Sequence, residues 1–130
     1  IISSNGVGYN LSHANGMELA HPRCFGAFPR AIKKYAIDEK IISLEKIISK
    51  MTLKPAQKIG LKNRGEIKVK NFADIVIFNK EQLTDNATLQ LPYQFPSGID
   101  HVIVNGIIAV ENGQYNDSLS GKIIKKHTDA

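Results

Sequence analysis

The residues His-Val-Ile-Val-Asn-Gly-Ile-Ile-Ala-Val, at positions 101–110, place two apolar runs on either side of an Asn-Gly pair. Asn105 and Gly106 are the residue types that a type I′ turn favours, because both central positions of that turn require a positive φ. We therefore expect a tight antiparallel hairpin here. Gly113 indicates a further turn after it, and the apolar, β-branched run at 73–78 predicts a buried strand before it.

The rest of the second half also predicts strands. Residues 66–69 alternate polar and apolar side chains, which is the period of a strand, and residues 122–125 predict a last strand. Residues 90–98 contain Pro92 and Pro96 and predict a loop.

The first half predicts helices. Apolar residues over 28–36 recur on one face of a helix, with Pro29 near its start, where the missing N–H costs nothing. Ser43 is the expected N-cap of a second helix, and Thr52 of a short third one. Gly60 is placed to end that third helix in the left-handed conformation.

The ends of this pattern divide the chain. Residues 1–4 predict the end of a strand, and the glycine-rich residues 5–26 predict a long loop of the kind that is usually functional or disordered. The order is therefore helices first and antiparallel strands second, an α+β arrangement. We expect residues 1–60 to form one unit, residues 61–126 a β unit, and residues 127–130 a tail.

Composition favours a soluble globular protein with no nucleic-acid or membrane partner. The chain is 42% hydrophobic and 22% charged, and none of its apolar runs approaches the roughly 20 residues that span a bilayer. The net charge of +5 comes from scattered lysines, whereas arginine would dominate at bidentate phosphate contacts. The single cysteine, Cys24, fits a reducing cytoplasm. Because the chain starts at Ile1 and not at Met, we expect a fragment or a processed product.

Short motifs in the middle of the chain resemble the C-terminal signature of the amidohydrolase superfamily. They are Thr52 with Pro55-Ala56, Gly60-Leu61, Arg64-Gly65, Ala73-Asp74-Ile75-Val76 and Val104-Asn105-Gly106. A second group narrows the resemblance to the N-acyl-D-amino-acid deacylases, or D-aminoacylases. It comprises His21-Pro22-Arg23, Gly26, Phe28-Pro29-Arg30, Asp85 and Ala87-Thr88. The resemblance implies an α/β parent enzyme, a TIM barrel with a small β-sandwich, of which this chain is the C-terminal portion.

The resemblance implies a zinc-dependent hydrolase that cleaves the amide C–N bond of N-acyl-D-amino acids. The zinc ligands of the family are His and Cys residues on earlier barrel strands, which this chain lacks. Its own histidines, at positions 13, 21, 101 and 127, show no ligand spacing. We therefore expect zinc in the parent family, but no metal ligands and no bound zinc in this chain.

Two residues are candidates for the site. Asn5 matches the catalytic Asp of the family, which deprotonates a zinc-bound water and later protonates the leaving amine. An amide has no titratable proton near neutral pH, so Asn5 cannot be a general base; on the residues alone it is equally a turn residue. Arg23 is a candidate to hold a carboxylate in bidentate contact, or else to pin a loop. For Arg30 we expect the structural role.

Two functions follow. In the first, the chain is part of a deacylase that is inactive in isolation and needs the missing N-terminal barrel portion, supplied by a separate chain. In the second, it is a catalytically dead remnant or a stand-alone interaction module without enzyme activity. A lone terminal piece leaves strand edges unpaired, which favours a homo-oligomer.

Overall fold

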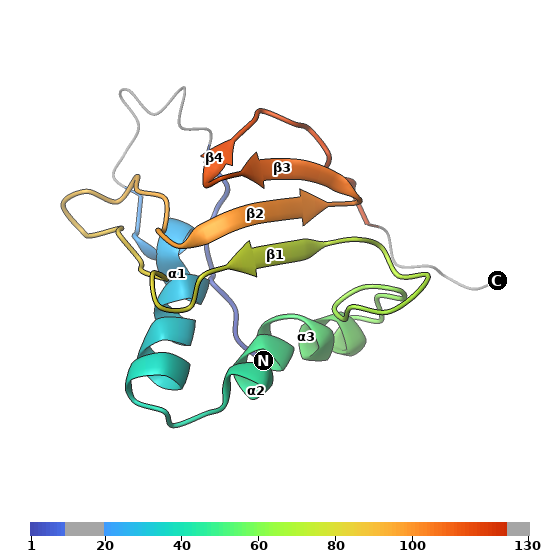
Figure 1. Cartoon of the computed structure of the whole chain (residues 1–130), viewed down its shortest axis with the longest axis horizontal. Coiled ribbons are helices and arrows are strands. Elements are labelled where there is room, and N and C mark those ends of the chain that lie inside the picture. The colour runs from blue at the N-terminus through green and yellow to red at the C-terminus, as the bar shows by residue number, and fades with distance from the viewer. Residues whose placement is uncertain (10–19, 125–130) are drawn as a thin grey trace.

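The computed structural model describes residues 1–9 and 20–124. The elements are α1 (Arg23–Ala31), the π-helix η2 (Ile32–Asp38), α2 (Leu44–Met51), α3 (Leu53–Lys58), β1 (Ile75–Phe78), β2 (Ile99–Val104), β3 (Ile107–Glu111) and β4 (Gln114–Tyr115) (Figure 1). The expected order of helices first and antiparallel strands second is confirmed. None of the helices in the described ranges has the length and apolar character needed to cross a membrane.

The sheet is a simple meander built on the predicted hairpin. Its four strands are antiparallel in the order β1-β2-β3-β4. Asn105 and Gly106 join β2 to β3 with φ of 51° and 84°, and Asn112 and Gly113 join β3 to β4 with φ of 50° and 75°. Both turns are therefore confirmed, because Asn and Gly are the residues that best tolerate the left-handed conformation.

Two of the predicted strands do not form. Residues 66–69 lie in an irregular connection, where Ile67 and Val69 are each 87% exposed. Residues 122–124 are likewise irregular, and Lys125 lies outside the described residues. Alternation alone does not make a strand, because its backbone groups need a neighbouring strand to bond. Within the described ranges, neither stretch has one.

β1 is shorter and less buried than the run 73–78 suggested. It spans Ile75–Phe78, and its two central residues, Val76 and Ile77, are exposed. The expectation of a buried strand is wrong because the described chain supplies no second layer over this part of the sheet. An apolar, β-branched composition indicates that a strand is suited to burial. Whether the strand is buried depends on which other elements pack against it.

The first helix begins earlier than predicted. α1 starts at Arg23, so residues 23–26 are helical and not loop, and Pro29 lies inside the helix and not near its start. Proline in a helix interior removes one backbone donor and crowds the preceding turn. The chain continues from α1 into the π-helix η2, whose wider turn is closed by the bond from Glu39 N to Lys34 O at 2.9 Å.

The next two helices begin and end close to the predicted residues. The Ser43 hydroxyl accepts from Lys46 N at 3.3 Å, so Ser43 caps α2 as expected. Thr52 stands at the predicted cap of α3, but its hydroxyl donates to Ile48 O at 2.9 Å and makes no capping bond. Gly60 follows α3 with φ of 75°, as predicted.

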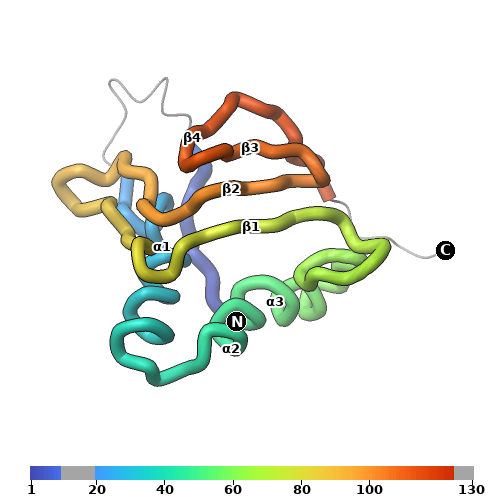
Figure 2. The backbone as a smooth tube through the Cα atoms, in the orientation of Figure 1, coloured from blue at the N-terminus to red at the C-terminus, as the bar shows by residue number. Residues whose placement is uncertain are grey.

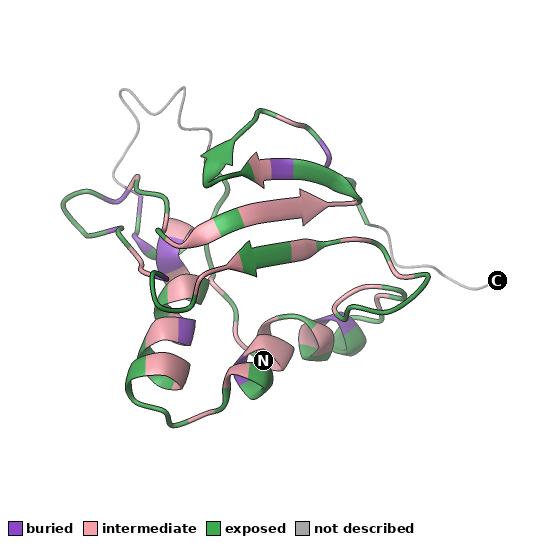
Figure 3. Cartoon of the chain, in the orientation of Figure 1, coloured by how far each residue is buried: buried purple, intermediate pink, exposed green. Residues whose placement is uncertain are grey.

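The hydrophobic core is small and lies where the helices meet one end of the sheet. Its buried centre consists of Ile32, Ile47 and Leu83, with Phe78 and Ile99 packed against it. Figure 3 shows how few residues are fully buried, and α2 and α3 lie along the β1 side of the sheet (Figure 1). Both halves of the chain thus share one core, and the predicted division at residue 60 stays a prediction.

The N-terminal segment is irregular and lies against a helix. Residues 1–9 have no regular secondary structure, so the expected strand end at 1–4 is wrong. Ile2 N donates to Lys50 O at 2.9 Å, which attaches the segment to the last turn of α2. A barrel strand forms only between neighbouring strands, and the described chain has none beside these residues.

Candidate functional site

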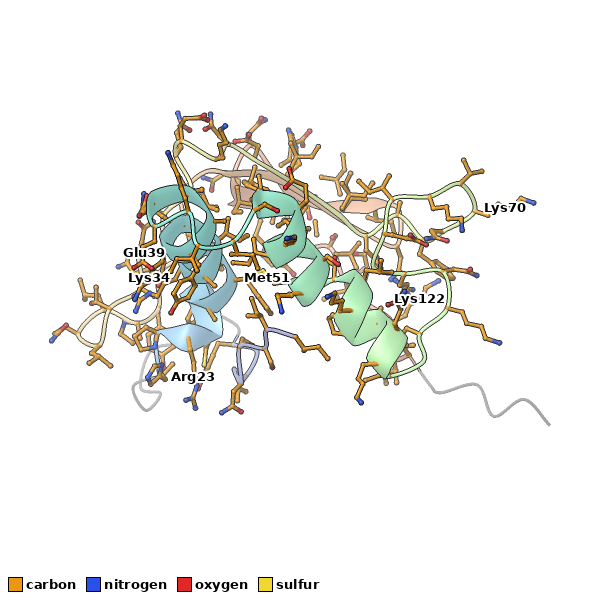
Figure 4. All side chains as sticks on the ribbon, turned by 90° about the horizontal axis from the view of Figure 1, so that it is seen from below. Arg23, Lys34, Glu39, Met51, Lys70 and Lys122 are labelled. Atoms are coloured by element: carbon orange, nitrogen blue, oxygen red, sulfur yellow. The ribbon has the colours of Figure 1, made fainter. Side chains whose placement is uncertain are left out.

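Asn5 and Arg23, the two candidate site residues, are brought to the same end of the molecule. Gly6 lies against the first turn of α1, where a Cβ at position 6 would be 2.9 Å from Cys24 Cα and 3.5 Å from Arg23 O. Only glycine allows the backbone of the N-terminal segment to approach the helix this closely. Figure 4 shows Arg23 at the start of α1, next to this segment.

Asn5 is exposed and adopts a left-handed backbone with φ of 47°. Its side chain forms no hydrogen bond with any other described residue, and Gly6 N donates to the Ser4 hydroxyl at 3.2 Å. Asn is among the few residues that tolerate this conformation. No described residue therefore occupies the polar atoms of this amide, although it has no proton to exchange near neutral pH.

Arg23 is exposed on the first turn of α1. Its backbone N–H donates to His21 Nδ1 at 3.1 Å, which fixes the entry to the helix. Its guanidinium makes no hydrogen bond or ion pair with the residues that the structure describes. An exposed guanidinium can bind a planar carboxylate in bidentate fashion.

Arg30 has the structural role that the sequence suggested. Its Nε donates to Asp85 Oδ2 at 2.6 Å, and its Nη2 donates to Ala87 O at 3.3 Å. The Asp85 carboxyl group is only 5% exposed, and its Oδ1 also accepts from Ala87 N at 2.9 Å. It occupies the space where a side chain at Gly26 would lie. The loop at 79–98 is thus pinned against α1 (Figure 2).

An aromatic cluster beside the candidate site was not predicted. The rings of Tyr9 and Phe25 stack at 5.9 Å between centroids, and Tyr93 meets each of them edge-on at 5.7 Å. Phe95 contacts Phe25 at 6.2 Å. Three separate segments supply these rings, so no periodic pattern in the sequence could have indicated the cluster. It joins the N-terminal segment, α1 and the loop before β2.

The signature motifs of the second half meet in one hydrogen-bonded network. The Arg64 guanidinium pairs with Asp74, donates to Asn105 Oδ1 at 2.6 Å, and lies 4.1 Å from the centre of the Phe72 ring. Asn105 N donates to Asp74 Oδ1 at 2.8 Å, and Asn105 Nδ2 donates to Ser120 O at 2.7 Å. These motifs therefore fix the sheet to the segments around it.

The described residues contain no metal centre. No group of three or more His, Cys, Asp or Glu side chains among residues 1–9 and 20–124 is close enough to hold a metal ion. His21 is exposed and its Nδ1 accepts from Arg23 N, and His101 lies in β2; positions 13 and 127 are outside the described residues. The donor set in the described ranges does not fit zinc.

A shallow hollow between η2 and the loop after β1 does not have the character of a ligand site. Its volume is about 230 Å³, and its charged lining residues are Arg30, Lys33, Lys34, Asp38 and Asp85. These charges largely neutralise one another, since Arg30 pairs with Asp85 and Lys33 with Asp38 at 3.0 Å. Small-molecule pockets are typically larger, at about 300–1,000 Å³, and mostly apolar.

Comparison with known proteins agrees with this architecture and these motifs. Residues 18–109 match the model of the amidohydrolase family. The chain belongs to the amidohydrolase family.

Within this family, the similar proteins include an N-acyl-D-glutamate deacylase and a D-aminoacylase. The chain is 40% identical over 86 residues to the N-acyl-D-glutamate deacylase of Alcaligenes xylosoxydans xylosoxydans, which covers 66% of this chain and 18% of that protein. It is 34% identical over 109 residues to the D-aminoacylase of the same organism, over 84% of this chain and 22% of the relative. The resemblance to the N-acyl-D-amino-acid deacylases is thereby confirmed, and the chain spans about a fifth of the length of these relatives.

A solved structure is also similar. It is the N-acyl-D-glutamate deacylase of Bordetella bronchiseptica in complex with zinc and a phosphonate inhibitor, which matches with a TM-score of 0.68 and 33% identity over 70% of this chain and 19% of that one. The TM-score shows that the matched part has the same fold as this deacylase, and the identity of 33% agrees with membership of the same family.

Proposed function

We propose that the chain is the C-terminal part of a hydrolase that cleaves the amide C–N bond of N-acyl-D-amino acids, and that it is inactive alone. The observation that carries this proposal is the approach of the Asn5–Gly6 turn to Arg23 at the start of α1. These are the residues that the deacylase resemblance singled out. Two of the similar proteins are named N-acyl-D-glutamate deacylase and D-aminoacylase, which supports this substrate class.

In this proposal Arg23 binds the carboxylate of the substrate. Its guanidinium is exposed and has no partner among the described side chains, so two parallel N–H donors are available to a carboxylate. Asn5 occupies the position of the general base. Its amide orients a polar group by hydrogen bonding but takes up no proton, so the chain as it stands lacks a base at this position.

In this proposal, the residues that bind zinc lie outside the described part of this chain. The structure of the Bordetella relative contains zinc, but residues 1–9 and 20–124 supply no ligand set for it. The TIM barrel and the rest of the β-sandwich are part of the same proposal, since the described chain has a single sheet and no barrel. A cytoplasmic location stays a prediction.

The alternative is an inactive remnant that serves as an interaction module. Asn5 favours it, because an amide at the base position removes the proton transfer. The open sheet favours it too, since Val76, Ile77, Ile107 and Ile108 are exposed apolar residues on its strands. Neighbouring residues of a strand point to opposite faces, so both faces of the sheet expose apolar side chains that a partner could cover. Association with a second copy of the chain stays a prediction.

A graft experiment separates the two functions. The matching C-terminal part of the Alcaligenes N-acyl-D-glutamate deacylase is replaced by this chain, either with Asn5 or with Asn5→Asp, and amine release from N-acetyl-D-glutamate is measured. We expect the Asp form to turn over about 10²–10⁴-fold faster than the Asn form, the usual contribution of a general base. Arg23→Lys in the Asp form should raise KM more than it lowers kcat.

The controls decide what a negative result means. Both grafts must show the same zinc content and the same thermal midpoint, so that the comparison is between folded enzymes. A folded, zinc-loaded Asn5→Asp graft without activity would favour the interaction module. Equal activity of the Asn and Asp grafts would contradict the role given to position 5.

A further inference from the structure

The chain contains four Asn-Gly pairs, at residues 5–6, 15–16, 105–106 and 112–113. Asparagine is one of the thermally labile residues, and a following glycine favours its reaction because no side chain shields the next backbone nitrogen. The reaction requires an asparagine side chain that can turn towards that nitrogen. It also requires a backbone N–H that is not held elsewhere. Asn15 lies outside the described residues, so three pairs can be compared.

Asn5 meets both requirements. Its side chain is exposed and forms no hydrogen bond within the described ranges. Gly6 N donates only to the Ser4 hydroxyl, at 3.2 Å and in an exposed position. That hydroxyl rotates freely about its own Cα–Cβ bond, so releasing the N–H requires no change in the backbone.

In the pair at 105–106, by contrast, both the side chain and the following backbone nitrogen are held by hydrogen bonds. Its Oδ1 accepts from Arg64 Nη2 at 2.6 Å, and its Nδ2 donates to Ser120 O at 2.7 Å. Gly106 N donates to Ala73 O at 2.9 Å. The side chain cannot turn towards Gly106 N until these three bonds open together.

The pair at Asn112 is intermediate in how far hydrogen bonds hold it. Its side chain is exposed, but Gly113 N donates to Asp100 O at 3.0 Å, a backbone acceptor in the hairpin. The nucleophilic nitrogen is therefore held by the sheet, although the Asn112 side chain has no hydrogen bond to another described residue.

We propose that Asn5–Gly6 is a site of spontaneous deamidation in the folded chain. Gly6 N attacks Asn5 Cγ, the new C–N bond closes a five-membered succinimide, and the Cγ–Nδ2 bond breaks. The Nδ2 group leaves as ammonia and carries away the proton of Gly6 N. Water then opens the ring at Cγ to give Asp, or at the backbone carbonyl to give isoaspartate. The sum is one amide and one water converted to one carboxylate and one ammonium ion, without change of oxidation state.

The modification bears on the site described above, and this consequence rests on the proposed function. Opening of the succinimide at Cγ leaves an Asp at position 5, which can act as a general base where the amide cannot. Opening at the backbone carbonyl lengthens the main chain by one carbon and moves the carboxylate away from that position. The ageing of the chain would thus change the chemistry of position 5 without any enzyme acting on it.

The test follows the three pairs by mass within one chain. The folded chain and the same chain unfolded in urea are incubated in mildly alkaline buffer and digested with a protease that cleaves after Tyr9, so that Asn5 is separated from the pair at 15–16. The peptides are then analysed by mass spectrometry over time. In the folded chain we expect Asn105 to react at least about tenfold more slowly than Asn5, because three hydrogen bonds must open first. In urea the three pairs should react at similar rates. Asn112 should be slower than Asn5 in the folded chain.

The matched control is Asn5→Gln, which keeps the amide but would require a six-membered ring. It should abolish the mass gain in the peptide that contains residue 5 and leave the other pairs unchanged. Reaction of Asn105 or Asn112 as fast as Asn5 in the folded chain would overturn the proposal, and so would a stable Asn5 in a folded chain whose unfolded form reacts. The mass analysis does not depend on enzyme activity. If Asn5 deamidates but the Asn5→Asp graft is inactive, the proposed function is refuted and the deamidation proposal stands.

Discussion

Arg64→Lys should destabilise the fold although the positive charge is kept. Arg64 bonds Asp74 and Asn105 at the same time, and its plane lies 4.1 Å from the centre of the Phe72 ring. A lysine can reach one of these oxygens but not both in a fixed fork, and it loses the planar contact with the ring. One charged hydrogen bond contributes about 1.5–3 kcal/mol and the ring contact about 0.5–1 kcal/mol. Because Asp74 is partly exposed, we expect a loss of unfolding free energy at the lower end of the sum of these two ranges, about 2 kcal/mol.

The assay is thermal and urea unfolding followed by circular dichroism. A loss of about 2 kcal/mol corresponds to a thermal midpoint lower by about 8 °C for a chain of this size. Arg23→Lys is the matched control, since this exposed arginine has no side-chain partner in the described part of the chain, and it should stay within about 0.5 kcal/mol. A stable Arg64→Lys protein, or an equal loss in Arg23→Lys, would refute the reasoning from the network.

Three further predictions use the same measurements. Ser43→Ala removes the hydroxyl that caps α2 and should lower the free energy of unfolding by about 1 kcal/mol, whereas Ser43→Asn should keep most of it. Gly26→Ala should destabilise by about 1–3 kcal/mol despite the better helix propensity of alanine, because the new methyl would overlap the Asp85 carboxylate; an unchanged midpoint would argue against that contact. Hydrogen bonds from its own backbone N–H and from Ser43 hold the pKa of Glu45 below the ordinary value of 4.5. The folded form therefore gains stability from this carboxylate above about pH 4.5 and loses it as the pH falls through the lowered pKa, a dependence that Glu45→Gln should flatten.

The parts of the fold that could be predicted are those set by local chemistry. Asn105-Gly106 needs only its own backbone preference to form the turn, and Ser43 needs only the next three residues to cap a helix. The wrong predictions concern residues whose state depends on distant partners. Residues 66–69 alternate polar and apolar side chains but have no strand to pair with in the described ranges. Gly26 is helical, and the Asp85 carboxylate, 59 positions away, lies where a side chain at Gly26 would be.

The same distinction applies to the candidate site. Asn5 and Arg23 are candidates because of the resemblance to a family. Their proximity depends on the close contact of Gly6 with α1, and the sequence does not single out Gly6 among the several glycines of this stretch. The aromatic cluster had no signal, since Tyr9, Phe25 and Tyr93 come from segments far apart in the sequence. Arg30 was assigned the structural role, but its partner Asp85 lies 55 residues away and could not be paired with it from spacing.

The network around Arg64 has a consequence for how the chain folds during synthesis. Arg64 and Asn105 are 41 residues apart, and Asn105 in turn holds Ser120, which lies 15 residues further on. Contacts between residues so distant form late, because a long loop must close before they return any free energy. The bond between Asn105 and Ser120 can therefore form only after the ribosome has released residue 120. Before that point the apolar strands lack this part of the network, and exposed strand edges are where chaperones and other nascent chains bind.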